Sequence, residues 1–110
     1  MIKGIGIDLE KIERFRSMTK GFMKSVYSDK EIEYCKKKSD PAMSFAGKFC
    51  AKEAVIKATG KNSMMKDIEI LNQKSGEVKV YIRSRHKKNI HCSISHTSEH
   101  AIAFVIVENK

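Results

Sequence analysis

Tryptophan is absent from this chain of 110 residues, and only 7% of its residues are aromatic. Proteins that bind single-stranded nucleic acid usually stack the bases on aromatic side chains, so such platforms are scarce here. The sequence also lacks internal repeats and low-complexity segments. At this length we expect one compact domain over residues 1–110, with no room for a second core.

Cysteine is also scarce, and the three cysteines, Cys35, Cys50 and Cys92, form no C-x-x-C pair. Neither a disulfide framework nor a structural zinc site is therefore expected, and reduced thiols in a reducing compartment are the simpler interpretation. No long apolar run opens the chain, since MIKGIGIDLEK reaches an acid after a few residues. We expect neither a signal peptide nor a membrane segment, and hence a cytoplasmic protein without a membrane partner.

Acidic residues are outnumbered, with 13 Asp and Glu against 22 Lys and Arg and a net charge of +9. A basic balance favours a polyanionic partner, which could be a nucleic acid, a phosphorylated cofactor, an acidic protein or a membrane surface. Composition does not choose among them. A small basic RNA-binding protein therefore stands as the main alternative function.

The first segment, residues 2–9, alternates as a strand with Gly4, Gly6 and Asp8 on one face. The two glycines leave space in which a ligand or another backbone could approach. Asp8 either caps a helix that starts near Leu9 or serves a ligand, and the spacing leaves both interpretations open. Apolar residues at three-residue spacing predict a short helix over residues 10–18.

Two further helices carry clear end signals. Ser28 and Glu31 fit a capping box, which predicts a helix over about residues 29–37, followed by a solvated basic connection at residues 36–39. Asp40 and Pro41 predict the start of a longer helix that ends at Gly60. Glu53 lies at the margin of the apolar stripe of this helix, one turn before Lys57. It forms either a surface i,i+4 ion pair with Lys57 or part of a site.

The remainder is β-like, with strands expected at residues 67–71, 77–83, 90–96 and 101–107. The last strand is apolar on both faces, which predicts a central or interface position. A zinc site from His91, Cys92, His96 and His100 is disfavoured, because His91 and Cys92 point to opposite strand faces. One strand, a helical block and further strands together predict an α+β fold.

Several of these residues suit a pyrophosphate ligand. Asp8 and Glu53 are hard oxygen donors of the kind that hold Mg²⁺. Lys48 and Lys57 can neutralise phosphate charge, and His96 can donate to a phosphate or carry a proton. Lys48 and Glu53 lie well apart around their helix, so a ligand common to both must be extended.

Three motifs then occur in the order found in holo-acyl-carrier-protein synthases, which the chain resembles over nearly its whole length. They are Gly4-Ile-Gly-Ile-Asp8, the run from Phe45 to Ala58 with its F-x-x-K-E-A-x-x-K pattern, and Ser93-Ile-Ser-His96. The resemblance implies a 4′-phosphopantetheinyl transferase fold, with an antiparallel-rich sheet packed on a long central helix. It also implies a homotrimer with active sites between subunits.

The implied activity is Mg²⁺-dependent transfer of the 4′-phosphopantetheine arm of coenzyme A to a serine of apo acyl carrier protein. This reaction releases 3′,5′-ADP and supports fatty acid biosynthesis, and it involves no nucleic acid. In this resemblance Asp8 and Glu53 hold the metal, while Glu53 and Lys57 are catalytic. The remaining implied contacts are those to coenzyme A, by Lys48, Lys57, Ser95, His96 and Thr97, and those to the carrier protein, by Arg14 and Lys24.

The chain departs from the family pattern in places. Lys48 stands where an arginine is common, which loses a bidentate fork. After Gly60 the sequence continues as Lys61-Asn-Ser-Met rather than with another glycine-rich step. A trimeric interaction module without catalytic activity is a further alternative, against which the intact set of Asp8, Glu53 and Lys57 argues.

Overall fold

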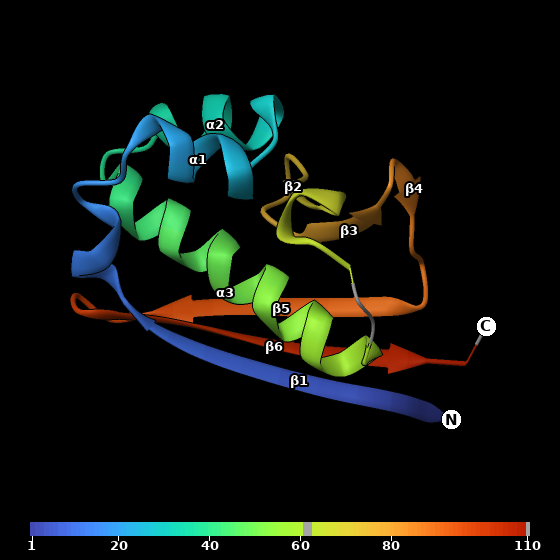
Figure 1. The fold of residues 1–110 in the computed structure, drawn as a ribbon. Coiled ribbons are helices and arrows are strands. Elements are labelled where there is room, and N and C mark those ends of the chain that lie inside the picture. The colour runs from blue at the N-terminus through green and yellow to red at the C-terminus, as the bar shows by residue number, and fades with distance from the viewer. Residues whose placement is uncertain (61–62, 110) are drawn as a thin grey trace.

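Two antiparallel sheets and one long helix build the molecule, for which a computed structural model describes residues 1–60 and 63–109. The larger sheet has the strand order β1-β6-β5 and the smaller one β2-β3-β4 (Figure 1). The strands are β1 (Ile2–Lys11), β2 (Ile68–Asn72), β3 (Val78–Ile82), β4 (Arg85–His86), β5 (Ile90–His96) and β6 (His100–Glu108). The predicted α+β class and antiparallel-rich sheet are confirmed, and so is the central position of the last strand.

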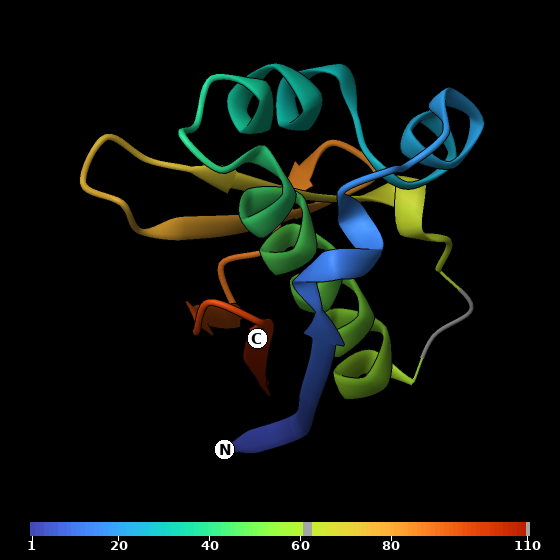
Figure 2. The ribbon, with the colours of Figure 1, turned by 90° about the vertical axis from the view of Figure 1, so that its left-hand side faces the viewer.

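The long helix, α3 (Pro41–Thr59), has the ends that the sequence predicts. The Asp40 side chain accepts a hydrogen bond from the Met43 backbone N–H at 3.4 Å, and Pro41 opens the first turn. Gly60 terminates the helix with φ at +61°, in the left-handed region that favours glycine. Figures 1 and 2 show α3 lying between the β1-β6-β5 sheet on one side and the helices α1 (Lys20–Val26) and α2 (Asp29–Lys36) on the other.

Strand β1 and helix α3 touch through their backbones. A Cβ on Gly6 would lie 2.0 Å from the Ala54 carbonyl oxygen, and one on Gly4 would lie 2.0 Å from that of Ala58. The space predicted beside the strand is therefore filled by a helix backbone, which only glycine permits. Asp8 is the next residue on the same strand face, so this contact sets its position along α3.

The predicted helix over residues 10–18 is wrong. Strand β1 instead continues to Lys11, because Glu10 and Lys11 pair with Ala101 and His100 of β6. A single 3₁₀ turn, η1 (Ile12–Phe15), follows. Asp8 therefore does not cap a helix but sits within β1, opposite Ala103.

Three short elements complete the helical layer and its connections. Helix α1 (Lys20–Val26) was not predicted, and Thr19 caps it by accepting from the Phe22 backbone N–H at 3.0 Å. Helix α2 (Asp29–Lys36) has the predicted capping box. A 3₁₀ turn, η2 (Met65–Asp67), leads into β2. The segment after Gly60 that departs from the family's glycine-rich pattern includes residues 61–62, which lie outside the described residues.

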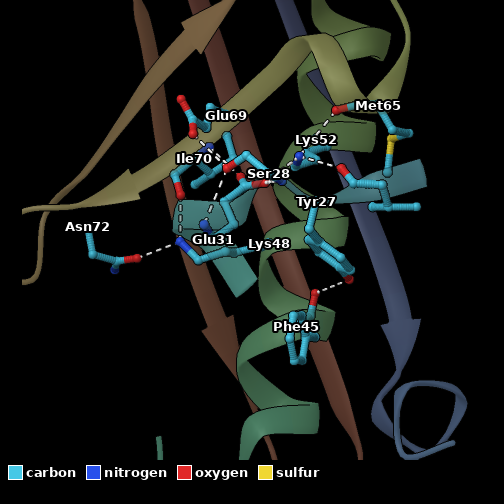
Figure 3. Close-up of polar contacts among 11 residues, drawn as sticks. Tyr27, Ser28, Glu31, Phe45, Lys48, Lys52, Met65, Glu69, Ile70 and Asn72 are labelled. Atoms are coloured by element: carbon cyan, nitrogen blue, oxygen red, sulfur yellow. Dashed lines mark hydrogen bonds and ion pairs between the residues drawn. The ribbon is translucent and has the colours of Figure 1, made fainter. Parts of the chain in front are cut away.

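A buried ion pair joins α2 to α3 (Figure 3). Lys52 Nζ lies 2.7 Å from Glu31 Oε1, and both side chains are fully buried. Lys52 also donates to the Val26 carbonyl at 2.6 Å, and Glu31 Oε2 accepts from the Ile70 backbone N–H at 2.7 Å. These bonds satisfy both charges inside the core and tie two helices to strand β2.

The three cysteines are free thiols, as predicted, with Cys35 and Cys50 buried and Cys92 half-buried. His91 is exposed while Cys92 faces inward, so the two side chains point to opposite faces of the strand, as predicted. No helix among the described residues is long and apolar enough to cross a membrane.

Candidate active site

The first cluster of functional side chains forms where the inner face of β1 meets the second half of α3. The Asp8 side chain is only 11% exposed, and its Oδ1 accepts from Lys57 Nζ at 3.3 Å. Lys57 Nζ also donates to the Ile7 carbonyl at 3.0 Å. Two residues 49 positions apart in sequence are thus brought together by the backbone contact of the strand with the helix.

The second oxygen of Asp8, Oδ2, is buried and has no hydrogen-bond partner among residues 1–60 and 63–109. A buried carboxylate oxygen without a donor is unfavourable unless a cation compensates its charge. This atom therefore suits a bound cation such as Mg²⁺. Across the described residues, no group of three or more His, Cys, Asp or Glu side chains is placed to hold a metal by itself.

Glu53 is half-buried on the same flank of α3. Cys50, Glu53 and Lys57 follow at i, i+3 and i+7, so they share one helix face. Burial and then the negative charges of Asp8 and Glu10 raise the pKa of the Cys50 thiol to about 12. Cys50 is therefore close to these two acids, and the helix face that it shares with Glu53 and Lys57 is turned toward β1. In the described part of the chain Lys57 pairs with Asp8, and no ion pair joins it to Glu53.

Glu10 belongs to this cluster, and sequence reasoning missed it. Burial and then the neighbouring Asp8 carboxylate raise the pKa of the Glu10 carboxyl to about 7, against the opposing effect of Arg14. The signal was available in the strand period of two, which places Glu10 on the same face as Asp8. Glu10 was missed because the predicted strand ended at residue 9, one residue before it.

Arg14 extends the cluster toward the helical layer. Its guanidinium forms an ion pair with Glu10 and lies 5.4 Å from the ring centroids of both Phe15 and Phe49. Phe22 of α1 also packs on Phe49, with centroids 6.2 Å apart. Lys24 lies exposed in the last turn of α1. The two predicted docking residues are thus carried by segments that share one aromatic cluster.

A second cluster lines a pocket of about 490 Å³ at the opposite edge of the sheet, beside β5. The pocket lies between α3, the end of α2, strand β5 and the hairpin of β2 and β3. Its lining residues are Tyr34, Lys38, Ser39, Asp40, Met43, Ser44, Gly47, Lys48, Asn72, Gly76, Glu77, Val78, Cys92, Ser93, Ile94 and His96.

Lys48 lines this pocket and is 3% exposed. Its Nζ donates to the Ile70 carbonyl at 2.5 Å and to Asn72 Oδ1 at 2.7 Å (Figure 3). Burial lowers the pKa of its ammonium group. Two of its three donors therefore hold the β2–β3 hairpin, a role that its sequence position did not indicate.

The residues predicted to contact coenzyme A at the end of β5 do not all point to the same side. His96 is exposed and lines the pocket, whereas Ser95 points to the other face of the strand, opposite Ile102. Thr97 lies in the following turn, where its Oγ1 accepts from the Glu99 and His100 backbone N–H groups at 3.2 and 3.0 Å. The structure therefore brings Lys48 and His96 together but not Ser95.

The two clusters face away from each other within one chain. Lys48 and Lys57 are nine residues apart, which turns them by about 180° around the helix. Asp8 lies on edge strand β1, and the pocket lies beside edge strand β5. A single ligand can reach both clusters only if it is long or if two copies of the chain contribute.

Comparison with known proteins assigns this architecture to a family. Residues 4–105 match the family model of the 4′-phosphopantetheinyl transferase superfamily. The chain is 39% identical to a holo-[acyl-carrier-protein] synthase of Clostridium tetani, covering 100% of this chain and 98% of the relative. It is 40% identical to the enzyme of the same name from Caldicellulosiruptor saccharolyticus, with 100% and 99% coverage.

Solved structures agree with the sequence matches. A holo-(acyl-carrier-protein) synthase from Bacillus anthracis in complex with CoA (3′,5′-ADP) superimposes with a TM-score of 0.87 at 34% identity, covering 100% of this chain and 99% of that one. The Helicobacter pylori synthase in complex with coenzyme A gives a TM-score of 0.77 at 30% identity, with 94% and 99% coverage.

Proposed function

The chain belongs to the 4′-phosphopantetheinyl transferase superfamily, and from this membership we propose that it transfers the 4′-phosphopantetheine arm of coenzyme A to a serine of apo acyl carrier protein. The observation that carries this proposal is the buried Asp8 carboxylate with its unpartnered Oδ2 beside Lys57. It lies in a chain whose full-length relatives are holo-[acyl-carrier-protein] synthases. In the reaction the serine oxygen attacks the β-phosphorus, and 3′,5′-ADP leaves.

Asp8 and Glu53 would hold Mg²⁺, since this ion usually takes one or two carboxylates together with substrate phosphates and water. When bound, the metal would draw negative charge from the pyrophosphate oxygens. Glu10 supports this assignment as a third acid, because burial and the neighbouring Asp8 carboxylate raise the pKa of its carboxyl.

Lys57 would stabilise the charge that develops on the transferred phosphate. Its ammonium already lies between Asp8 and the Ile7 carbonyl, so it is held on the correct flank of α3 before substrate arrives. Glu53 would accept the proton of the attacking serine, from the adjacent turn of the same helix face. Positioning two anionic reactants is the main requirement of this chemistry.

Arg14 and Lys24 would dock the acidic carrier protein, and their charge would make docking sensitive to salt. Arg14 connects this surface to the reacting centre through Glu10, its ion-pair partner. An Arg14→Glu variant should raise the KM for carrier protein at least about tenfold more than the KM for coenzyme A. Equal changes in the two constants would contradict a docking role.

We further propose a trimer in which neighbouring subunits share each active site. The outer face of the β1-β6-β5 sheet supports this, because Ile5, Ile7 and Leu9 are 61%, 53% and 60% exposed beside Phe104 at 43%. An apolar face of this kind is typical of an interface. The opposite orientation of the two clusters supports it too, since the pocket of one subunit would complete the Asp8 cluster of another.

The test is to incubate the protein with Mg²⁺, coenzyme A and an apo acyl carrier protein, and then to weigh the carrier protein by mass spectrometry. We expect the gain of one phosphopantetheine, which EDTA or Asp8→Ala abolishes. Asp29→Ala is the matched control, because this acid is exposed in the first turn of α2. An unchanged mass with several carrier proteins and folded protein would refute the proposal.

The RNA-binding alternative gains no support from the structure or the relatives. The charge of +9 is accounted for by two anionic substrates, coenzyme A and an acidic carrier protein. RNA binding also gives no reason for a buried carboxylate at Asp8. The cytoplasmic location stays a prediction.

A further inference from the structure

Glu10 connects two charged residues that have different roles. Its side chain is 15% exposed and forms an ion pair with Arg14, four residues later. Asp8, two residues earlier, shares its strand face, and both acids lie close to the Cys50 thiol of α3. In the described part of the chain, Arg14 forms no ion pair with any other carboxylate. Its positive charge therefore acts on the two neighbouring acids of β1.

The Arg14 guanidinium is held in place on one side and open to solvent on the other. It lies 5.4 Å from the ring centroids of Phe15 and Phe49, and the attraction of a cation to an aromatic ring adds to its ion pair with Glu10. The Arg14 side chain is nevertheless 53% exposed. A guanidinium carries several N–H donors, and one carboxylate does not occupy them all. Donors therefore remain for an acid that arrives from outside.

The affinity of Asp8 for a cation depends on the charges around it. Asp8 Oδ2 is buried and has no hydrogen-bond partner within residues 1–60 and 63–109. Glu10 adds negative charge nearby, and Arg14 offsets it. A carrier-protein acid bound to Arg14 would take part of that positive charge, whether it shares the guanidinium with Glu10 or draws it away. In both cases the negative charge near Asp8 is less compensated, so a cation binds there more tightly.

We propose that the Glu10–Arg14 pair couples carrier-protein docking to cation binding: an acidic side chain of the carrier protein on Arg14 raises the affinity of Asp8 for a divalent cation. Glu10 is the positioning residue of this coupling. The inference rests on the proposed function. By thermodynamic linkage, the cation raises the affinity for the carrier protein by the same factor. Because Arg14 is half exposed, solvent screens its charge, and we expect a factor of about five, at the lower end of measured couplings.

Mn²⁺ is the probe, and electron paramagnetic resonance reports how much of it stays free. Titrations without coenzyme A, with and without saturating apo carrier protein, should give an about fivefold lower Mn²⁺ Kd in its presence, once Mn²⁺ bound by the carrier protein alone is subtracted. The carrier-protein Kd, measured by fluorescence anisotropy with and without Mn²⁺, should change by the same factor. Glu10→Gln should reduce this factor to about one. Glu13→Gln is the matched control, because Glu13 is an exposed acid of η1 that pairs with Arg16 at 3.6 Å.

Arg14→Gln tests the sign of the effect without any carrier protein. The variant should bind Mn²⁺ more tightly than the wild type, whereas a purely structural role of Arg14 would weaken binding or leave it unchanged. Arg16→Gln is its control, since Arg16 pairs with Glu13 and Asp40 instead. Near-UV circular dichroism verifies that each variant is folded.

A wild-type factor of one, a factor that survives Glu10→Gln, or weaker Mn²⁺ binding by Arg14→Gln would each overturn the inference. Phosphopantetheine transfer by the wild type is measured separately by mass spectrometry. Transfer together with a factor of one would uphold the proposed function and refute the coupling. A factor of about five without transfer would uphold the coupling and refute the proposed function.

Discussion

The buried Lys52–Glu31 pair makes a sharp prediction about stability. Replacing Lys52 with Met leaves the Glu31 carboxylate buried without its counter-ion, and breaking such a pair usually costs about 3–5 kcal/mol. Glu31 keeps two backbone donors, the N–H groups of Ser28 and Ile70 at 2.9 and 2.7 Å. The loss should therefore lie near the lower end, about 3 kcal/mol. For a chain of this length that corresponds to a fall in Tm of about 12 °C.

A double-mutant cycle measured by urea unfolding tests this value at fixed protein concentration. The second variant is Glu31→Gln, whose neutral amide oxygen can still accept from one of the two backbone N–H groups. Lys52→Met/Glu31→Gln should regain at least about 1.5 kcal/mol over the additive expectation, because the unpaired charge is gone. Lys30→Met, on the exposed side of α2, is the control.

An additive cycle, or a Lys52→Met loss under about 0.5 kcal/mol, would refute the reasoning. The result bears on function because Lys52 belongs to the F-x-x-K-E-A-x-x-K motif. Its complete burial indicates that this lysine supports the fold, whereas Glu53 is half-buried and Lys57 is exposed beside Asp8.

Three other predictions follow from the structure. Gly6→Ala should cost about 2 kcal/mol in urea unfolding, since its Cβ would lie 2.0 Å from the Ala54 carbonyl, while Gly21→Ala should not destabilise. Phe104→Asp should convert the proposed trimer to monomers in light scattering and abolish transfer; a trimer that survives this change would contradict the proposed interface. Burial raises the pKa of Cys92 to about 12, so its thiol stays protonated at pH 8 and its alkylation rate should rise with pH up to that value. A plateau near pH 9 would contradict this.

The sequence predicted α3 closely because the signals for its ends are local. An Asp-Pro start and a glycine stop act within a few residues of the helix ends, whatever the rest of the chain does. The error at residues 10–18 has a different cause. Ile12 and Phe15 are buried at a spacing of three, which a single 3₁₀ turn satisfies as well as an α-helix does.

The roles of individual polar side chains were harder to predict. Lys48 and Lys52 bind carbonyl groups that lie far from them in sequence, so only the tertiary fold reveals that both are buried anchors. Glu10 was missed because the extent of β1 depends on pairing with β6. Asp8 and Lys57 were identified from motifs, and the structure brings their side chains together.

The glycine contact between β1 and α3 has a consequence for how the protein tolerates change. Asp8 is located by one backbone resting on another, with no side chain between them at Gly4 and Gly6. Substitutions among the apolar residues on the far side of α3 can alter the volume of the core without changing this spacing. Asp8 should therefore keep its position when core side chains are replaced by others of different size. A redesigned core can differ widely in sequence as long as Gly4 and Gly6 are retained.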